Sequence, residues 1–470
     1  MKRLFVALLA ATSAALALGA GPAPAAVHTK AFDVPAKMDP YEVRQTVSTV
    51  ATPRTEGFIT GMSVNVVDKN GAPVPIRRLM LHHIVFAAVG RPDTTCQGQP
   101  FVGYDSRPTN FSNFAQPFYG AGEERNVLAL PKGYGYPIHK NDIWGMVWML
   151  MNHRGVTDSA FIRYTVTWQD ASDGLTAVTP YWLDENNCRA DPIFNVPGTG
   201  GKHSTYKKTY DFTMPESGRI VAGGGHVHGG AYGLTISEPD CSNRTVFKSS
   251  PAWGMPSNPF YHVRPILHEP GPISMSGYLS QTGYPIAAGQ RLRLTAAYDN
   301  SRAHTRVMGI SLVYVAPQAV SGCAAPPTDG RTFQPAQLKG IPFRTKTPVF
   351  KVPLTGIGAD GKAHTISRPA GRTVKLDKRS SVKVRDYYFA APNASVAPGS
   401  TLTWDFGPAT LHNVTLANGP QGFASFNLSE GRRFKFRFTK PGTYRIFCAL
   451  HPVLMTETVT VRPHKRHKKH

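Results

Sequence analysis

Short apolar and alternating runs, broken by Gly, Pro, Asn and Asp, recur along the chain after residue 25. Runs of this length between turn-forming residues are typical of β-strands, and none has a convincing helical period. The runs with the strongest strand pattern cover residues 58–67, 79–88, 143–151, 161–168, 291–298 and 307–315. Near the C-terminus Phe434, Phe436 and Phe438 alternate with Lys435 and Arg437, the period of a half-buried strand. The pattern predicts an all-β protein.

The pattern and the composition divide the chain into six segments. Residues 1–25 have the form of an export signal, with Lys2-Arg3 before an apolar stretch and the cleavage motif Ala23-Pro24-Ala25 at its end. The remaining segments are two β-sandwiches, a linker with additional strands, a third domain and a basic tail, expected at 27–195, 196–315, 316–379, 380–462 and 463–470. No later stretch has the ~18 or more apolar residues that span a bilayer. We therefore expect a protein without a transmembrane segment, secreted or held at the cell envelope.

The charge of the chain is strongly positive. Its formal net charge is +23, with 52 Lys and Arg against 29 Asp and Glu, and loss of Lys2 and Arg3 with the signal would leave +21. An exported protein does not ordinarily meet nucleic acid, so anionic cell-wall polymers or membrane surfaces are the expected partners. The basic tail is either a wall-binding or copper-gathering segment or a disordered solubilising end.

The five cysteines all lie in the exported part of the chain, where disulfides persist. If Cys448 binds a metal, four remain: Cys96, Cys188, Cys241 and Cys323. Three pairings of these four are possible. We favour Cys96–Cys188 with Cys241–Cys323, because each disulfide would then stay within one domain.

A potential copper site lies in the last hundred residues. Cys448, His451 and Met455 follow a strand-like run, and His412 lies 36 positions upstream of the cysteine. One thiolate, two imidazoles and a thioether are the ligands of a blue, type 1 copper site that transfers single electrons. The alternative is a buried or disulfide-bonded cysteine beside a surface histidine.

Residues 382–461 resemble the plastocyanin–pseudoazurin branch of the cupredoxin family. The motifs that carry the likeness are Tyr-Tyr-Phe-Ala-Ala-Pro at 387–392, Val-Ala-Pro-Gly at 396–399, His412-Asn413-Val414 and Lys-Pro-Gly-Thr-Tyr at 440–444. The resemblance implies a Greek-key β-sandwich that exchanges electrons with an external donor or acceptor. One detail departs from it: three residues separate His451 from Met455, where other members have two or four.

The N-terminal half contains a second group of copper-type ligands. Its members are His82, His83, His153, His226, His228 and Met308. His226 and His228 stand at i and i+2, so on a strand both rings face the same side and could chelate one ion. The adjacent His82 and His83 would point to opposite faces of a regular strand, and they could share an ion only at a bulge or a distorted strand end.

In their order these ligands resemble the copper type II, ascorbate-dependent monooxygenases, over residues 57–315. The resemblance implies two jelly-roll domains, each with one copper. His82, His83 and His153 would hold an electron-storing copper, and His226, His228 and Met308 the catalytic copper that activates O2. Two departures concern the substrate: Gly224 and Leu312 stand where the peptide-hydroxylating members have an Arg and a Tyr. Peptide amidation is therefore not expected.

The sequence thus favours an exported oxidoreductase with one type 1 copper and two further copper ions. Its monooxygenase-like unit would hydroxylate a small-molecule substrate with O2, and the cupredoxin would supply electrons one at a time. An alternative is a non-catalytic copper-binding or electron-transfer protein. A third reading is a wall-binding protein in which the cupredoxin holds the only metal. The number of copper ions bound per chain distinguishes these hypotheses, since about three ions fit the first two and one fits the last.

Overall fold

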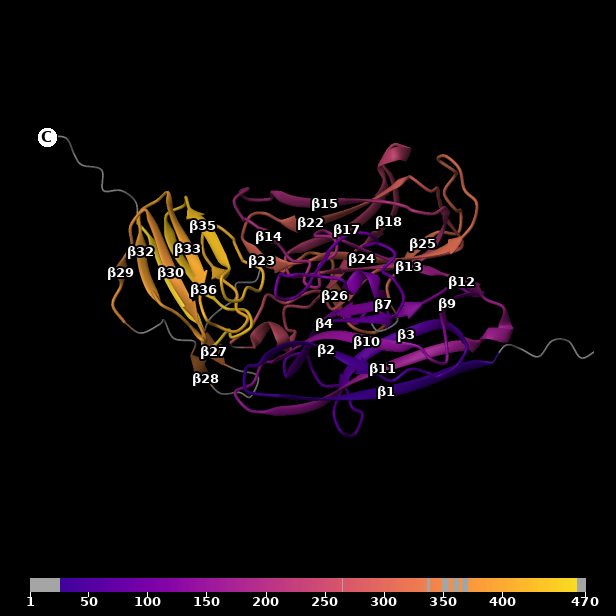
Figure 1. The fold of residues 1–470 in the computed structure, drawn as a ribbon, viewed down its shortest axis with the longest axis horizontal. Helices are drawn as coiled ribbons and strands as arrows, with labels where there is room; N and C mark the ends of the chain where they lie inside the picture. The colour runs from indigo at the N-terminus through magenta and orange to yellow at the C-terminus, as the bar shows by residue number, and fades with distance from the viewer. Residues whose placement is uncertain are drawn as a thin grey trace, which may run out of the picture.

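The computed structural model describes residues 26–263, 265–335, 339–348, 355–357, 363–365 and 371–462. The expected export signal and the tail at 463–470 lie outside these residues. Within them the protein is all-β, as predicted, and its helical segments are four short 3-10 turns, η1 (Phe111–Asn113), η2 (Ala171–Asp173), η3 (Pro239–Cys241) and η4 (Pro259–His262). Two N-terminal sandwiches are stacked on each other, and the C-terminal domain lies at one end of the stack (Figure 1).

The first sandwich consists of a six-stranded and a four-stranded sheet. The six-stranded sheet contains β1 (Val27–Met38), β11 (Asp158–Asp170), β3 (Gly57–Val67), β9 (Tyr134–Ile138), β12 (Thr176–Ala177) and β8 (Leu128–Ala129). The four-stranded sheet contains β2 (Val43–Val50), β10 (Ile143–Asn152), β4 (Leu79–Val89) and β7 (Ala115–Gly122). The strand β3 alternates buried and partly exposed positions, whereas β4 is buried almost throughout. A continuously apolar strand indicates a sheet that is covered on both faces.

The second sandwich provides the cover on the outer face of that sheet. Its five-stranded sheet contains β13 (Thr179–Asp184), β24 (Gly309–Pro317), β16 (Gly218–Val227), β21 (Gly277–Ile286) and β25 (Arg331–Phe333). Its four-stranded sheet contains β15 (Thr205–Thr213), β22 (Arg291–Asp299), β17 (Ala231–Glu238) and β18 (Arg244–Ser249). Val221, Ala222, Leu312 and Tyr314 join the apolar core of the first sandwich. The two sandwiches therefore form one packed unit.

The boundary between these sandwiches differs from the prediction. We placed it at 195/196, but β13 already pairs with β24 of the second sandwich from Thr179 onward. The last strand of the first sandwich, β12, ends at Ala177. The composition does not change at this point, because both sandwiches are built from the same kinds of strand and only the pairing separates them.

Short strands connect and complete the sandwiches. The pairs are β14 (Phe194–Val196) with β23 (His304–Val307), β5 (Phe101–Val102) with β6 (Pro108–Thr109), and β27 (Thr355–Ile357) with β28 (Ala363–Thr365). A small sheet contains β20 (Ser274–Met275), β19 (Pro251–Gly254) and β26 (Phe343–Arg344). The segment expected to be a linker thus contributes β25 and β26 to the second sandwich. Among the described residues no helix is long and apolar enough to cross a membrane.

The C-terminal domain is a third sandwich with its own core. One sheet contains β29 (Val374–Lys375), β32 (Asn393–Val396), β37 (Thr456–Val461), β36 (Gly442–Phe447) and β34 (Thr415–Asn418). The other contains β31 (Tyr388–Phe389), β30 (Arg379–Arg385), β33 (Ser400–Phe406) and β35 (Arg433–Phe438). Trp404 is fully buried between them, and its Nε1 donates to Glu457 Oε2 at 2.8 Å. The parallel pairings β30–β33 and β32–β37 give the Greek-key order expected of this domain.

Two disulfides close the N-terminal unit. Cys96 is bonded to Cys188 and Cys241 to Cys323, the pairing favoured from the sequence. The reason given for the first pair was wrong, because Cys188 follows β13 and so belongs to the second sandwich. This disulfide ties the two sandwiches together.

Glu185, at the end of β13, gives the unfolding free energy a dependence on pH. Burial raises the pKa of Glu185 to about 9, although Ala296 N donates to its Oε1 at 2.9 Å. The folded protein therefore holds a proton that the unfolded chain releases above about pH 4.5. Since the folded state binds the extra proton, this contribution to stability declines as the pH rises toward 9. Between about pH 5 and about pH 9, the free energy of unfolding of the native protein should fall relative to that of Glu185→Gln by up to about 1.4 kcal/mol per pH unit. Denaturant titrations measure this difference. The exposed control Glu430→Gln should show no such trend, and a parallel pair of curves for Glu185→Gln and the native chain would contradict the prediction.

Candidate metal centres

The C-terminal ligand loop follows the end of β36 and is closed by its own backbone. Cys448 N donates to Met455 O, His451 N to Cys448 O, and Met455 N to His451 O, each at 3.0 Å. These bonds turn the chain so that Cys448, His451 and Met455 lie on one side of a compact loop. Cys448 and Met455 are fully buried.

The donor atoms of this loop face the ring of His412 from a neighbouring segment. Cys448 Sγ lies 3.8 Å from His412 Nδ1 and 3.7 Å from His451 Nδ1, and the two nitrogens are 3.1 Å apart. Ligands about 2.0–2.3 Å from a common ion have mutual distances of this size. The residues present therefore fit a type 1 copper, with His412, Cys448 and His451 as close ligands and Met455 as the neighbouring thioether.

Hydrogen bonds outside the ligand set fix the orientation of the donors. His412 Nε2 contacts Asp386 Oδ1 at 2.9 Å, which leaves Nδ1 toward the cysteine. Asn413 N donates to Cys448 Sγ at 3.4 Å, and Asn413 Oδ1 accepts from Ala449 N at 2.8 Å. A carboxylate on the far nitrogen of a ligand histidine selects its tautomer and its ring orientation.

The protonation of these groups reflects their burial. Burial raises the pKa of the Cys448 thiol, and burial together with the neighbouring His412 lowers the pKa of His451 to about 4. The imidazole is thus neutral at neutral pH and keeps a lone pair for a metal. The thiol gives up its proton when a metal binds.

The role of Asp386 as a positioning residue can be tested directly. We expect Asp386→Ala to weaken copper binding by roughly 10-fold, the lower end for loss of such a hydrogen bond, because the carboxylate is half exposed. Competition with a copper chelator, followed by the blue absorption, measures the change. The matched control is Asp377→Ala in the same domain, and equal affinity of both variants would contradict the assignment.

The N-terminal histidines come together at the seam between the two sandwiches. On β4 the pairing with β10 skips one residue, so that Met149 is opposite His83 and Leu150 opposite Leu81. His82 is therefore the extra residue of a β-bulge. From the sequence, His82 and His83 could approach one ion only at a bulge or a distorted strand end, and the structure has a bulge there. Their rings lie 5.3 Å apart.

His226, on β16, and His228, directly after this strand, reach the same seam. Their ring centroids are 5.0 Å apart, as expected for positions i and i+2 on a strand. His226 Nδ1 lies 3.0 Å from Glu124 Oε2, which leaves its Nε2 without a hydrogen-bond partner in the described part of the chain. Burial lowers the pKa of His226, but the charge and hydrogen bond of Glu124 outweigh it and the pKa stands above its ordinary value.

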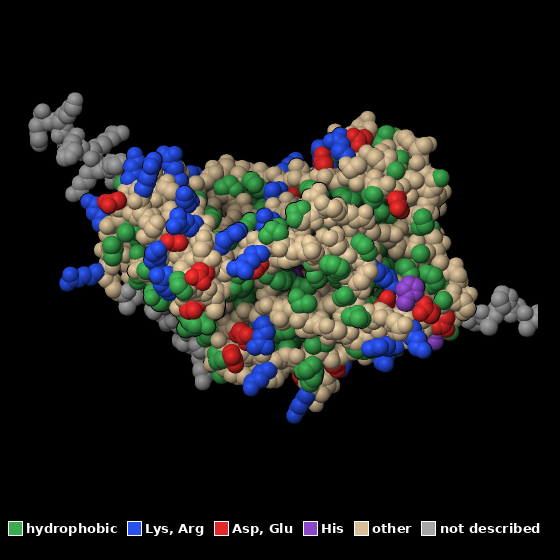
Figure 2. Space-filling view, in the orientation of Figure 1, with side chains coloured by type: hydrophobic (Ala, Val, Ile, Leu, Met, Phe, Trp, Pro, Cys, Tyr) green, Lys and Arg blue, Asp and Glu red, His purple; other side chains and the backbone are tan. Residues whose placement is uncertain are grey.

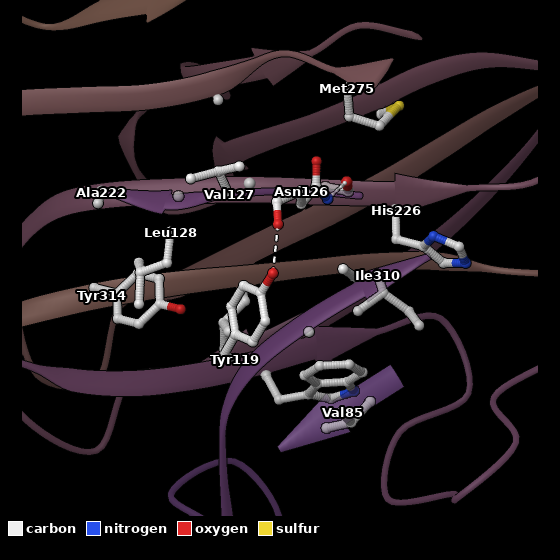
Figure 3. A pocket seen from close by; sticks show the side chains of 18 of the residues that line it. Val85, Tyr119, Asn126, Val127, Leu128, Ala222, His226, Met275, Ile310 and Tyr314 are labelled. Atoms are coloured by element: carbon white, nitrogen blue, oxygen red, sulfur yellow. Dashed lines mark hydrogen bonds between the residues drawn. The ribbon is translucent and has the colours of Figure 1, made fainter. Parts of the chain in front are cut away.

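His226 also borders an apolar pocket between the sandwiches (Figure 3). The pocket has a volume of about 100 Å³ and a largely apolar lining that includes Leu128, Ile310 and Tyr314. Met308 and His83 contribute to it from the seam. Met308 is buried at the break between β23 and β24, where its carbonyl accepts a 2.6 Å hydrogen bond from Tyr298.

The grouping of these histidines differs from the two predicted triads. The structure brings His82, of the first triad, and His228, of the second, together with His268. Candidate ligand atoms of these three side chains all lie within 4.8 Å of one another. No pattern in the sequence pointed to His268, a single histidine in a Pro-rich loop, or to the buried Glu123 and Glu124 beside the seam.

His153, the third member of the first predicted triad, is buried near the seam. Both of its ring nitrogens lack a hydrogen-bond partner among the described residues, and its ring packs edge-on against Phe260 at 5.4 Å. Burial lowers the pKa of His153 to about 3, with a further contribution from His268. We call His82, His83, His226, His228 and His268 the seam histidines.

A cavity connects the seam with the copper loop of the C-terminal domain. It has a volume of about 230 Å³, and its walls include His82, His83, His228 and His268 on one side. Phe447 and Ala449, the two neighbours of Cys448, line it on the other side. The two chain neighbours of Cys448 therefore face His82, His83, His228 and His268 across one cavity.

Comparison with known proteins agrees with the C-terminal site. Residues 377–462 match the family model "Copper binding proteins, plastocyanin/azurin family". The C-terminal part is 30% identical over 94 residues to amicyanin-alpha of Methylorubrum extorquens, a match that covers 19% of this chain and 73% of the relative. The fold and the ligand loop thus define a type 1 copper protein of the electron-transferring class. Through this domain the chain belongs to the plastocyanin/azurin family.

Two solved structures are also similar to a part of this chain. A purple cupredoxin from Nitrosopumilus maritimus is 25% identical, and the match covers 18% of this chain and 99% of that chain with a TM-score of 0.17. An oxidised amicyanin variant is 26% identical, with 18% of this chain and 85% of that chain covered and a TM-score of 0.17.

The N-terminal unit matches a different family from the one expected. Residues 149–318 match the model "Stress up-regulated Nod 19" and not the copper type II monooxygenases that the order of ligands suggested. The matched segment includes His153, His226, His228, His268 and Met308 but begins after His82 and His83. The assignment of residues 57–315 to a monooxygenase-like region is corrected accordingly.

Proposed function

We propose that the chain is an exported copper oxidoreductase in which the cupredoxin domain exchanges electrons with the seam histidines of its own N-terminal unit. The shared cavity carries this proposal, because it places the neighbours of Cys448 opposite His82, His83 and His228. Copper held by His412, Cys448, His451 and Met455 supplies one-electron chemistry. With copper also bound by the seam histidines, the N-terminal unit would store electrons or accept them from the cupredoxin domain.

The contacts between the domains support an internal exchange of electrons. The cupredoxin segment from Thr415 to Asn427 lies against both sandwiches. Its carbonyls accept hydrogen bonds from Thr305 Oγ1 at 2.9 Å, Arg306 Nη1 at 2.8 Å, Asn195 Nδ2 at 3.0 Å and Ser106 Oγ at 2.8 Å. The Arg189 guanidinium stacks over the ring of Phe426 at 4.2 Å. A domain held by this many oriented contacts keeps its copper loop at a fixed place relative to the seam.

The docking can be weakened without a change in any ligand. A Cβ at Gly422 would lie 2.6 Å from Val196 O and 2.9 Å from Ala303 Cβ, so Gly422→Ala must push the domains apart. We expect the blue absorption and its copper content to stay unchanged while transfer from the reduced type 1 site into the N-terminal unit slows by roughly tenfold, the factor for about 1.4 kcal/mol of docking. Anaerobic flash reduction of the copper-loaded chain measures this rate. At Gly145 an added Cβ has no contact shorter than 3.7 Å, so Gly145→Ala is the control. Equal rates in both variants would refute an internal exchange of electrons.

The outer face of the cupredoxin suggests where an anionic partner binds. Lys and Arg side chains gather on this domain in the space-filling view (Figure 2). On β35 Arg433, Lys435 and Arg437 are exposed, and Arg379 and Lys383 are exposed on β30 of the same sheet. Such a face attracts anionic wall polymers or membrane surfaces, in line with an exported protein at the envelope. Binding to teichoic acid that falls steeply with salt, and that is lost in the triple alanine variant of β35, would support this partner.

A second candidate function is hydroxylation of an apolar small molecule. The apolar pocket beside His226 favours it, since Gly224 leaves its wall open and a Cβ there would meet no atom within 4 Å. The reaction inserts one oxygen atom of O2 into a C–H bond and reduces the other to water, with two electrons from ascorbate and two protons. A copper there would have His226 Nε2 as a ligand, since this buried nitrogen has no hydrogen-bond partner in the described part of the chain. Oxygen uptake with ascorbate that is unchanged in His226→Ala would exclude this function.

A further inference from the structure

Three histidines from distant segments converge where the two N-terminal sandwiches meet. His82 lies at the bulge of β4, His228 directly follows β16, and His268 lies between η4 and β20. The His82 ring is 4.7 Å from that of His228 and 4.4 Å from that of His268. One ligand atom of each side chain lies within 4.8 Å of the other two. Three imidazoles at these separations can bind a single first-row metal ion.

Burial keeps two of these rings, His82 and His228, in the neutral form that binds metals. His82 and His228 are buried, and the Nε2 of His228 has no hydrogen-bond partner among the described residues. Burial, followed by the neighbouring histidines, lowers the pKa of His82 to about 4 and that of His228 well below its ordinary value. Buried polar atoms are normally paired, so an unpaired imidazole nitrogen that faces two others calls for a ligand.

Glu123 completes the surroundings of this cluster. Its Oε1 lies 2.6 Å from His268 Nε2 and 3.4 Å from His82 Nδ1, and its Oε2 accepts from Gly271 N at 2.8 Å. Burial raises the pKa of this carboxyl, but His268 and His82 together lower it by more, so the group is ionised. A carboxylate beside three imidazoles is either a fourth ligand or the partner that orients them.

We propose that His82, His228 and His268, with the Glu123 carboxylate, form a binding site for one divalent metal ion of the copper–zinc class at the seam of the two sandwiches. The site takes one histidine from each of the two predicted triads and adds a third that the sequence did not single out. Because His82 belongs to the first sandwich and His228 and His268 to the second, the ion joins the two. The inference goes beyond the electron-transfer proposal, since zinc would fill the same site without any redox role.

The test removes the type 1 site first, so that its result does not depend on blue copper. The full chain with Cys448→Ser is loaded with Zn²⁺ or with Cu²⁺, desalted, and its metal counted by mass spectrometry. We expect the further change His268→Ala to remove one ion per chain and to abolish the rise in Tm that the ion causes. The control is His262→Ala, six positions away, whose exposed ring contacts Pro256 O at 3.0 Å.

Each outcome decides the proposal. Loss of one ion in His268→Ala but not in His262→Ala, together with fewer imidazole nitrogens in the pulsed EPR of the Cu²⁺ form, supports the site. Loss for zinc alone assigns the site to zinc, and loss for copper assigns it to copper. If His268→Ala fails to fold, His268→Gln takes its place, because the ring is partly exposed. Unchanged metal counts for both ions would overturn the proposal.

Discussion

Replacement of Cys448 by Ser abolishes the blue absorption of the copper-loaded protein completely. The thiolate is the one sulfur anion of the site, it lies 3.7 and 3.8 Å from the two imidazole donors, and an alcohol in its place stays protonated at neutral pH. Copper bound by the remaining imidazoles would give only a weak, colourless site. Visible absorption and EPR of the loaded variant measure the loss.

The control for this change is Cys448→Ser examined without metal. The serine is close in volume to the buried cysteine, so the circular dichroism of the domain and its chemical shifts away from the loop should remain those of the native chain. A blue band that persists in the variant would show that the thiolate is not a ligand. The ligand set derived for this loop would then be wrong.

Replacement of Arg306 by Met destabilises the native assembly by about 3–5 kcal/mol, the range for removal of one partner from a buried ion pair. Arg306 Nη2 lies 2.5 Å from Asp191 Oδ2, and the two side chains are 12% and 8% exposed. Burial already raises the pKa of Asp191 even with the guanidinium in place, so an unpaired carboxylate there is costly. The same guanidinium donates to Ser425 O of the cupredoxin, so the variant also loses a docking contact. Urea unfolding of the N-terminal unit measures the effect.

The double variant Arg306→Met with Asp191→Asn provides the matched comparison. Without the buried charge, most of the lost stability should return, while the lost docking contact should not. Transfer between the domains should therefore remain slow in the double variant although its unfolding midpoint recovers. If the single variant unfolds like the native chain, Arg306 is not part of a buried pair that holds the domains.

The sequence was sufficient for whatever depends on local pattern. The period of residues 58–67 and 291–298 predicted strands that the structure contains as β3 and β22. The order of His412, Cys448, His451 and Met455 predicted a copper loop because three of these ligands are close in the chain, and backbone bonds alone bring them together. The spacing of His226 and His228 similarly predicted two adjacent rings.

Features that depend on the packing of distant segments were not predictable. The domain boundary near residue 178 is defined only by the pairing of β13 with β24. His268 reaches the seam through an irregular loop, where no periodic pattern marks which way a side chain points. His82 and His228 lie close together only because the two sandwiches are stacked face to face. The order of the ligands along the chain does not show how the two sandwiches are stacked.

In the proposed function, electrons pass inside one chain between the type 1 site and the seam. Anaerobic flash reduction of the copper-loaded full chain tests it most directly, with the blue absorption followed in time. We predict a first-order recovery of the blue band whose rate does not change with protein concentration and which disappears when His82 and His228 are both replaced by Ala. A recovery rate proportional to protein concentration, or the same rate in the double variant, would contradict the account.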